Sequence, residues 1–309
     1  MELRQLRYLV GVSEAGSLLG ASHILHVAQP ALSLQMAALE AELGAVLFTR
    51  SSRGMSLTDS GKTLLEYAKI VLADVERARS AVQNVTHELS GEVLIGLPTT
   101  VALVATLPIL EAARQRHPKV FLRLVESHSG YLKEWLQAGR LDLSVLFASA
   151  PQSWLVQRPL LREKLCVVGP PAHGKHPMPR SFDLGKLADL ALMLPGKDHG
   201  LRRIIEEACA LKNIKLNVLA EIDSLPNIKK AVSAGLAYTV LSPGAVAEEV
   251  KAGQLQQATL VKPHISRTIV CATSLLRPLT PAASAMVELI NEILRSLVIN
   301  SNWPGDLEK

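Results

Sequence analysis

The sequence predicts an α/β chain in which a small helical domain, one long helix and a larger two-lobed domain follow one another. Three observations predict this organisation. Residues 1–58 hold three helix-like runs and then two short β-prone runs. Residues 59–89 keep one uninterrupted apolar spacing. After residue 90, strand-like and helix-like runs alternate, and the same succession of runs occurs twice.

The composition fits a folded chain of two or three domains rather than a disordered or membrane protein. Its 309 residues are 48% hydrophobic and 20% charged, and compact domains usually run about 100 to 200 residues. No run of about 18 uncharged apolar residues occurs, so we expect neither a membrane span nor a signal peptide. We therefore expect the protein in the cytoplasm, where three widely spaced cysteines suit a reducing environment.

The net charge of +5 says little about nucleic-acid binding, because the basic surplus lies after residue 90. Residues 1–58 hold four basic and four acidic side chains. A DNA-binding function must therefore be argued from the placement of individual groups.

The first domain carries the signals of a helix-turn-helix. Gly16 ends the first helix, and Ser17 offers an N-cap hydroxyl to a second helix over residues 18–25. Pro30 is tolerated in the first turn of a helix, so a third helix is predicted from about Gln29 to Gly44. Two helices joined by a short turn, the second opening with polar side chains that can reach bases, form a helix-turn-helix.

Two β-prone runs, VLFTR and SLT, flank the turn SSRGM and predict a hairpin. This hairpin would be a wing, with Arg50 and Arg53 at its edge. An arginine there can enter the minor groove or hold a phosphate, whereas a glutamine that opens the preceding helix can read base edges in the major groove. Taken singly, each of these side chains is better explained as an ordinary solvated residue.

The order of the whole block resembles the amino-terminal signature of LysR-type transcription regulators over more than forty positions. The similarity includes Gly16-Ser17, the run QPALS at residues 29–33, Leu43-Gly44 and Leu47-Phe48. Leu19 and Leu34 depart from the family pattern, and Leu34 stands where a long polar or basic residue is common, so the DNA contact expected there is in question. The resemblance implies a winged helix-turn-helix that contacts double-stranded DNA through Gln29, Pro30, Ser33, Gln35, Arg50 and Arg53.

Residues 59–89 show the spacing of a coiled coil. Apolar residues recur at alternating intervals of four and three. A period of about 3.5 kept over this length is typical of a dimerisation seam rather than of a helix packed on its own domain. We therefore predict a homodimer or homotetramer that presents two recognition helices to two half-sites. The predicted seam consists of Leu64, Ala68, Val71, Val75, Ala78, Val82, Val85 and Leu89.

The larger domain, residues 90–300, contains an internal repeat. The runs VLIGLPTT, VFLRLVES and DLSVLF, with helical runs between them, are echoed about 96 residues later by LALMLPG, KLNVLAEIDS and LAYTVLS. Two such β-α-β-α-β lobes usually face each other across a cleft into which helix N-termini point. This cleft is the default ligand site. The polar end of the chain, residues 301–309, is expected to be flexible.

This domain resembles the periplasmic-binding-protein-like effector domain of the same family, and LSGEVLIGLP, LLREKLCVVG and EIDSLPNIKKAVSAG resemble its nitrogen-assimilation-control branch. The resemblance implies one lobe over about 91–162 and 268–300 and another over about 163–267. The helix N-termini and arginines favour an anionic or strongly polar effector. For Thr99 and Thr100, helix capping is the more common role of such residues. Effector contacts are expected at Thr99, Thr100, Ser129, Phe147, His199 and Arg202.

The sequence offers no motif for an enzyme, a cofactor or a metal ion. Gly61-Lys62-Thr63 resembles the end of a phosphate-binding loop, but Ser56 stands where that loop needs a glycine. His173 and His176 lie in a Pro-rich loop without further ligands nearby. Two alternatives stay open: a regulator that works without an effector, and a small-molecule-binding protein or enzyme built on the two lobes. For an activator, RNA polymerase is a further expected partner.

Overall fold

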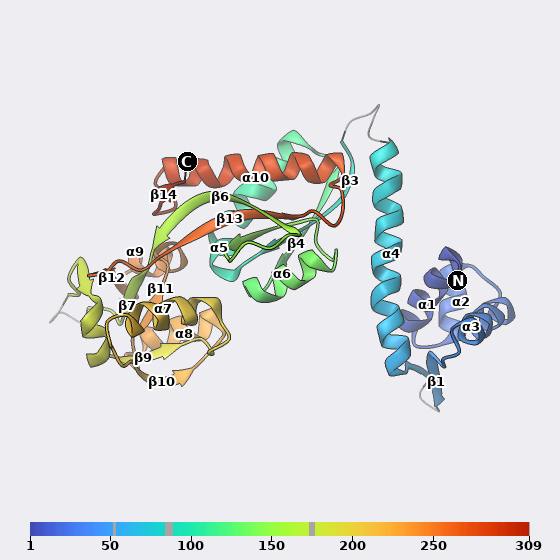
Figure 1. Ribbon diagram of the computed structural model, residues 1–309, viewed down its shortest axis with the longest axis horizontal. Helices are drawn as coiled ribbons and strands as arrows, with labels where there is room; N and C mark the ends of the chain where they lie inside the picture. Colours follow the sequence, from blue (N-terminus) through green and yellow to red (C-terminus); the bar gives the residue numbers. More distant parts are fainter. Residues whose placement is uncertain (52–53, 84–88, 173–176, 309) are drawn as a thin grey trace. The chain divides into compact units, whose positions relative to one another are not determined.

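A computed structural model of the protein describes residues 1–51, 54–83, 89–172 and 177–308. The chain forms two compact units, Met1–His87 and Glu88–Lys309 (Figure 1). Each unit has an apolar core of its own. Within the described part of the chain, no helix is long and apolar enough to cross a bilayer.

Three helices enclose the core of the first unit: α1 (Leu3–Ala15), α2 (Leu18–Leu25) and α3 (Gln29–Leu43). Gly16 ends α1 in the left-handed conformation, with φ at 64°. Ser17 Oγ accepts a hydrogen bond from Gly20 N (3.0 Å) and so caps α2. Pro30 lies in the first turn of α3, where a missing N–H breaks no helical hydrogen bond. The predicted bounds of the second and third helices are confirmed.

The wing is a two-stranded hairpin of β1 (Phe48–Ser51) and β2 (Gly54–Leu57). The Glu40 carboxylate ties it to α3, because it accepts hydrogen bonds from Leu47 N (2.7 Å) and Phe48 N (3.2 Å). β2 starts two residues before the predicted SLT run and lies against the turn between α1 and α2. A Cβ on Gly54 would fall 2.6 Å from the Gly16 carbonyl oxygen, so this close approach requires glycine.

The long helix α4 (Asp59–Gln83) packs its first turns on the same unit. Ala68 is buried in the core of this unit, and Leu64 and Leu72 pack against that core. Further along, Glu76 lies 3.7 Å from the guanidinium of Arg7 on α1. α4 is therefore joined to α1 rather than free along its whole length.

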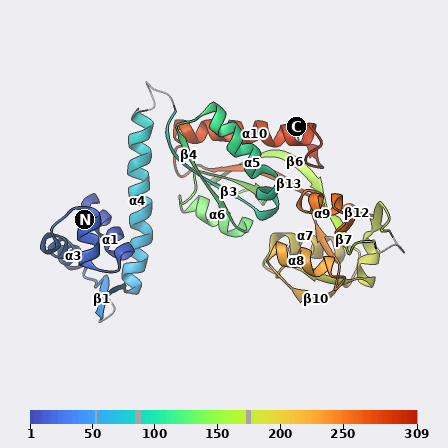
Figure 2. The ribbon, with the colours of Figure 1, turned by 180° about the vertical axis from the view of Figure 1, so that it is seen from behind.

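The first lobe of the second unit is built on one six-stranded sheet, with α5 and α10 over one face and α6 over the other (Figure 1, Figure 2). The helices are α5 (Thr99–Arg116), α6 (Ser129–Gln137) and α10 (Pro281–Ile299). β3, β4 and β5 are parallel, whereas β13 is antiparallel to β5 and β6. The strand order is β14 (Asp306–Leu307), β6 (Leu155–Lys164), β13 (Ser266–Ser274), β5 (Leu143–Phe147), β3 (Gly91–Leu97) and β4 (Val120–Glu126).

The second lobe repeats the β-α-β-α-β order of β3 to β5, which confirms the internal repeat. Its equivalent elements are β9 (Ala191–Leu194), α7 (Gly200–Ala210), β10 (Asn217–Glu221), α8 (Leu225–Ser233) and β11 (Thr239–Leu241). In both lobes the first two strands pair in parallel. Gly139 and Gly235, which follow α6 and α8, both have positive φ (71° and 77°). The lobe also contains β7 (Cys166–Gly169), β8 (Ser181–Asp183), β12 (Gln256–Val261), α9 (Ala247–Lys251) and the 3₁₀ helices η1 (Leu184–Asp189) and η2 (Pro243–Val246).

The chain crosses between the lobes twice, from β6 to β7 and from β12 to β13. The two crossing segments are hydrogen-bonded to each other, since Leu165 N donates to Ile265 O (2.8 Å) and Leu260 N donates to Leu165 O (3.1 Å). The second lobe is therefore one continuous segment of chain, whereas the first lobe is made of segments before and after it.

Residues 301–308 pack against the first lobe, so the expectation of a flexible tail is wrong. Trp303 is 1% exposed, and its Nε1 donates to Glu163 Oε2 (2.9 Å). β14 adds an edge strand to β6, and Arg162 Nε donates to Glu308 Oε1 (2.8 Å). The prediction followed the polar composition of the segment. Burial of its one large aromatic side chain, together with the hydrogen bond of that side chain, instead fixes the segment on the lobe.

Candidate nucleic-acid interface and effector site

α3 buries one side in the core of its unit and leaves the other side in solvent. The buried side consists of Leu32, Met36 and Leu39. Of the residues expected to contact DNA, Gln29 and Pro30 are exposed in the first turn, and Ser33 and Gln35 lie half-buried after them. α2 and α3 pack on each other and on α1 through the shared core. This is the arrangement in which the second helix of a helix-turn-helix can enter a major groove.

The wing arginines are described only in part. Arg50 lies in β1 opposite Met55 of β2, but its side chain is not among those that the structure describes. Arg53 lies outside the described residues, as do His173 and His176. Among the described residues, no group of three or more histidines, cysteines or carboxylates could hold a metal ion.

The predicted dimerisation seam on α4 divides into two parts. Ala68 is enclosed by the core of its own chain, so its assignment to a contact between chains is wrong, because the first turns of α4 run along α1. Leu64 packs against the same core. Val85 lies outside the described residues, and Leu89 lies in no helix or strand. The remaining seam residues reach solvent to different degrees: Val75 is half-buried, and the exposed ones are Val71, Ala78 and Val82.

A buried ion pair lies beside the crossing segments of the second unit. Arg267 of β13 faces Glu163 of β6, with Nη2 and Oε1 2.5 Å apart, and both side chains are almost fully buried. The same guanidinium donates to Thr100 Oγ1 (3.0 Å) and lies 3.7 Å from the centroid of the Phe147 ring. Two residues expected to contact an effector therefore surround one buried cation.

Two histidines, one from each lobe, contact each other near this ion pair. His128 precedes α6 and His199 precedes α7, and their ring centroids lie 4.6 Å apart in an edge-to-face arrangement. His199 Nδ1 accepts a hydrogen bond from Leu201 N (3.1 Å), which caps α7 and leaves the ring proton on Nε2. Burial, and then the charges of His128 and Arg267, lower the pKa of His199 to about 4, against an opposing effect of Asp223. His199 is therefore a neutral hydrogen-bond donor at physiological pH.

Ser129, which directly follows His128, carries an unsatisfied hydroxyl. It is the first residue of α6, and its Oγ is buried without a hydrogen-bond partner among the described residues. A buried polar atom left in this state costs about 1 to 3 kcal/mol, which a ligand atom or a water molecule would offset. Thr99, in the first turn of α5, is half-buried. Thr100 of α5 and His199 before α7 thus both lie near Arg267, and Ser129 is the chain neighbour of His128, whose ring contacts His199.

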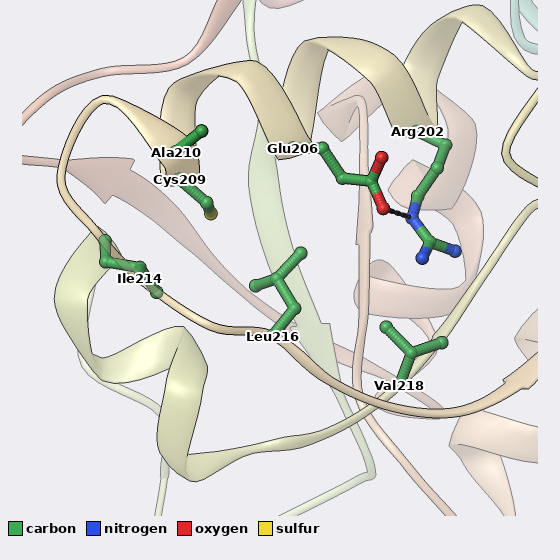
Figure 3. A pocket seen from close by; sticks show the side chains of 7 residues that line it. All are labelled: Arg202, Glu206, Cys209, Ala210, Ile214, Leu216 and Val218. Carbon is green, nitrogen blue, oxygen red and sulfur yellow. Dashed lines mark hydrogen bonds and ion pairs between the residues drawn. The ribbon is translucent and has the colours of Figure 1, made fainter.

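Arg202 serves a different part of the second lobe. Its side chain is buried, and it donates to Glu206 Oε1 (2.7 Å), to the Pro195 carbonyl (3.2 Å) and to Glu221 Oε1 (3.3 Å). Figure 3 shows it on the wall of a pocket between α7 and β10, above Leu216 and Val218. Two carboxylates already compensate its charge. These contacts give Arg202 a structural role, and the effector contact expected of it stays a prediction.

Sequence reasoning missed Arg267, Glu163 and His128. The sequence does contain a signal for Arg267. It lies two residues from both Ile265 and Ile269, so all three point to the same, inner side of the strand, where a charge needs a buried partner. No local pattern identifies that partner, since Glu163 is 104 residues away along the chain.

Family models match both units of the chain. The model described as "Bacterial regulatory helix-turn-helix protein, lysR family" matches residues 3–62, and the one described as "LysR substrate binding domain" matches residues 86–295. The chain belongs to the LysR family of DNA-binding transcription regulators. This family and the relatives described next are regulators rather than enzymes, so the enzyme alternative falls.

Relatives and solved structures cover nearly the whole LysR-family chain. The nitrogen assimilation regulatory protein nac of Klebsiella aerogenes is 36% identical over 96% of this chain and 95% of its own. The protein of the same name from Escherichia coli is 34% identical over 97% of both chains. The expected similarity to the nitrogen-assimilation branch is therefore confirmed.

Two solved regulators share the fold of this LysR-family chain. A cysteine variant of full-length OxyR from Pseudomonas aeruginosa has a TM-score of 0.70 and 26% identity, over 96% of this chain and 95% of its own. Full-length CbnR in complex with its target DNA has a TM-score of 0.71 and 22% identity, over 95% of this chain and 100% of its own. The α/β fold class with its amino-terminal helix-turn-helix is thereby confirmed.

Proposed function

We propose that this LysR-family regulator reads DNA as a dimer, with α3 in the major groove and the wing on the adjacent backbone or minor groove. The exposed first turn of α3 carries the proposal, since Gln29 stands free to reach a base edge there. CbnR, which has the same fold, is solved with its target DNA. The exposed seam residues Val71, Ala78 and Val82 of α4 support dimerisation. As a regulator of bacterial type, it would act in the cytoplasm and, when activating, contact RNA polymerase.

Replacing Gln29 by alanine tests the DNA-reading part of the proposal. Affinity for a duplex selected from a random library should fall, because a good base contact gives about 1 to 3 kcal/mol of discrimination, while affinity for random duplex should stay unchanged. Arg53→Ala is the matched comparison, since loss of a phosphate contact lowers both affinities and flattens the salt dependence. Equal losses on selected and random duplex for Gln29→Ala would show that Gln29 does not read bases.

We further propose that a small anionic or strongly polar effector binds at the cluster of Thr99, Thr100, Ser129, Phe147, His199 and Arg267. The unsatisfied Ser129 hydroxyl supports this use, because a ligand acceptor would complete its hydrogen bonding. The neutral His199 offers an Nε2–H donor from the opposite lobe. A ligand held by both lobes would favour one arrangement of the two, which is how it could change DNA binding.

Thermal shift against a panel of small metabolites tests this second part, using wild type and Ser129→Ala. The variant should be at least as stable as wild type, because the hydroxyl that it loses is buried and unsatisfied. A metabolite that raises the melting temperature of wild type should do so less in Ser129→Ala. His199→Asn is a second variant, since asparagine can keep the helix cap but lacks the imidazole. Equal responses in all three proteins would place the effector elsewhere.

One observation favours a regulator that needs no effector. Glu163 already compensates the charge of Arg267, and Thr100 and Phe147 already contact the same guanidinium. The chain thus supplies its own partners at the place where an anion would bind. A wild-type protein that binds operator and shows no thermal shift with any metabolite of the panel would support this alternative.

A further inference from the structure

The outer side of α3 is apolar along its whole length. The residues that point away from the buried side of the helix are all exposed: Pro30, Ala31, Leu34, Ala37, Ala38 and Ala41. A solvent-facing helix side normally carries charged or polar residues. The six side chains on this outer side can instead neither donate nor accept a hydrogen bond.

Leu34 is the longest side chain on this outer side and lies at its centre. It is 69% exposed. Pro30 lies one turn before it, and Ala37 and Ala38 lie one turn after it. Each alanine side chain ends at Cβ, so the isobutyl group of Leu34 extends further from the helix than its neighbours. Ser33 and Gln35 diverge from it by about 100° on either side of the helix.

The chemistry of the major groove limits what Leu34 can recognise. Base edges there present hydrogen-bond donors and acceptors, together with one apolar group, the C5-methyl of thymine. A leucine forms no hydrogen bond, and its only favourable contact with a base edge is apolar. We propose that Leu34 reads the thymine C5-methyl group and so selects a T·A pair in each half-site. This inference rests on the proposed placement of α3 in the major groove.

The surrounding residues favour DNA over a protein as the occupant of this side. The apolar residues other than Leu34 are small, so the helix backbone can approach the floor of a groove closely. Polar Gln29, Ser33 and Gln35 border the apolar side and offer hydrogen bonds to neighbouring base edges or phosphates. The side is also continuous with the first turn of α3, which carries the proposed base contact of Gln29.

Deletion of single methyl groups from the DNA tests the inference directly. A tight duplex is selected from a random library on the full-length protein and resynthesised with each thymine in turn replaced by deoxyuridine, which lacks only the C5-methyl. With wild type, each half-site should contain one thymine whose replacement alone weakens binding about fourfold. This change corresponds to about 0.8 kcal/mol for one buried CH₂-sized group. Replacement in both half-sites should weaken it about fifteenfold.

At the thymine whose replacement weakens binding of wild type, the variant Leu34→Ala should bind the duplexes with thymine and with uracil equally well. The contact that distinguishes thymine from uracil is then gone. Leu43→Ala is the matched control, since Leu43 is an exposed leucine of the same helix on its opposite side. It should keep the full response to uracil. Circular dichroism and thermal melting of both variants should match wild type, as neither side chain is in the core.

Two results would overturn the inference. Either no single thymine in the selected duplex depends on its methyl group, or the dependence persists in Leu34→Ala. An exposed leucine with no effect on DNA would then be a contact for a protein partner. Failure of the library to enrich any duplex would be a separate result, because it would remove the proposed reading of DNA by α3 together with the role of Leu34.

Discussion

His199 caps α7 through Nδ1, the nitrogen that would have to take up a proton for the ring to become charged. Its pKa is lowered to about 4 in the folded protein, whereas an unperturbed histidine has a value of about 6.5. Between these two values the unfolded chain binds a proton that the folded chain does not. The free energy of unfolding should therefore fall as the pH is lowered from about 6.5 to 4.

Urea unfolding at pH 7 and pH 5 measures this effect, and His199→Asn separates it from other titrations. Asparagine is a good N-cap and does not titrate, so the variant should lose less stability than wild type between the two pH values. The remaining histidines and carboxylates are the same in both proteins. An identical loss in wild type and variant would mean that His199 does not contribute to acid sensitivity.

At the level of residues, sequence reasoning succeeded where the signal was local. Gly16, Ser17 and Pro30 act at helix ends through their own backbone or side chain, and each lies where it was predicted. The ion pairs of Arg202 could not be predicted in full, because its partners Glu206 and Glu221 come from two elements, and only Glu206 is close in sequence. A polar residue near a helix start looks the same whether it faces a ligand or a carboxylate.

Among the elements, α4 shows how one apolar spacing can serve two partners. Its first turns pack on α1, while Val71, Ala78 and Val82 remain exposed. A regular interval of three and four residues predicts an apolar side of a helix, but it does not tell whether the same chain or a second chain covers it. The sequence therefore predicted the helix and could not predict where its intramolecular contact ends.

Val82→Asp tests the exposed part of α4. Val82 is 75% exposed in one chain, so the substitution should leave the fold intact, whereas two aspartates facing each other in a dimer seam would repel and lose their hydration. Light scattering should show a smaller assembly, and operator affinity should fall. Ala73→Asp places the same charge at an exposed position away from the seam and should change neither. An unchanged assembly for Val82→Asp would contradict a seam on this helix.

The carboxy-terminal segment, residues 301–308, has an ordered packing that the sequence did not predict. Its contribution can be measured with Trp303→Phe, which keeps a buried ring but removes the donor to Glu163. We expect a loss of about 1 to 3 kcal/mol in the free energy of unfolding, because a buried carboxylate loses a hydrogen bond. Asp306→Asn, which affects only an exposed ion pair with Lys164, should cost less than about 0.5 kcal/mol. Similar small losses in both would contradict a structural role for the indole N–H.

Across the whole molecule, the two units have separate cores, and a chain that starts at residue 88 is expected to fold without the first unit. Circular dichroism should show native α/β content and a cooperative thermal transition, and the protein should no longer bind DNA. A fragment that aggregates or melts without cooperativity would mean that the second unit depends on the first.

The repeat within the second unit could be predicted from the sequence because each half carries its own strand and helix pattern. The composition of the six-stranded sheet could not. The whole second lobe separates β6 from its neighbours β13 and β14 along the chain, and no short run of residues records which distant strand becomes a neighbour. The buried pair of Arg267 and Glu163 depends on this pairing and was missed with it.

The burial of Trp303 against Glu163 has a consequence for synthesis on the ribosome. The second lobe is one continuous segment and can fold while the rest of the chain is still being made. The first lobe needs β13, α10 and finally Trp303, all of which are translated after the whole second lobe. The lobe whose translation starts first is thus the one that is completed last. A chain broken off between β12 and Trp303 would hold a finished second lobe and an unfinished first lobe.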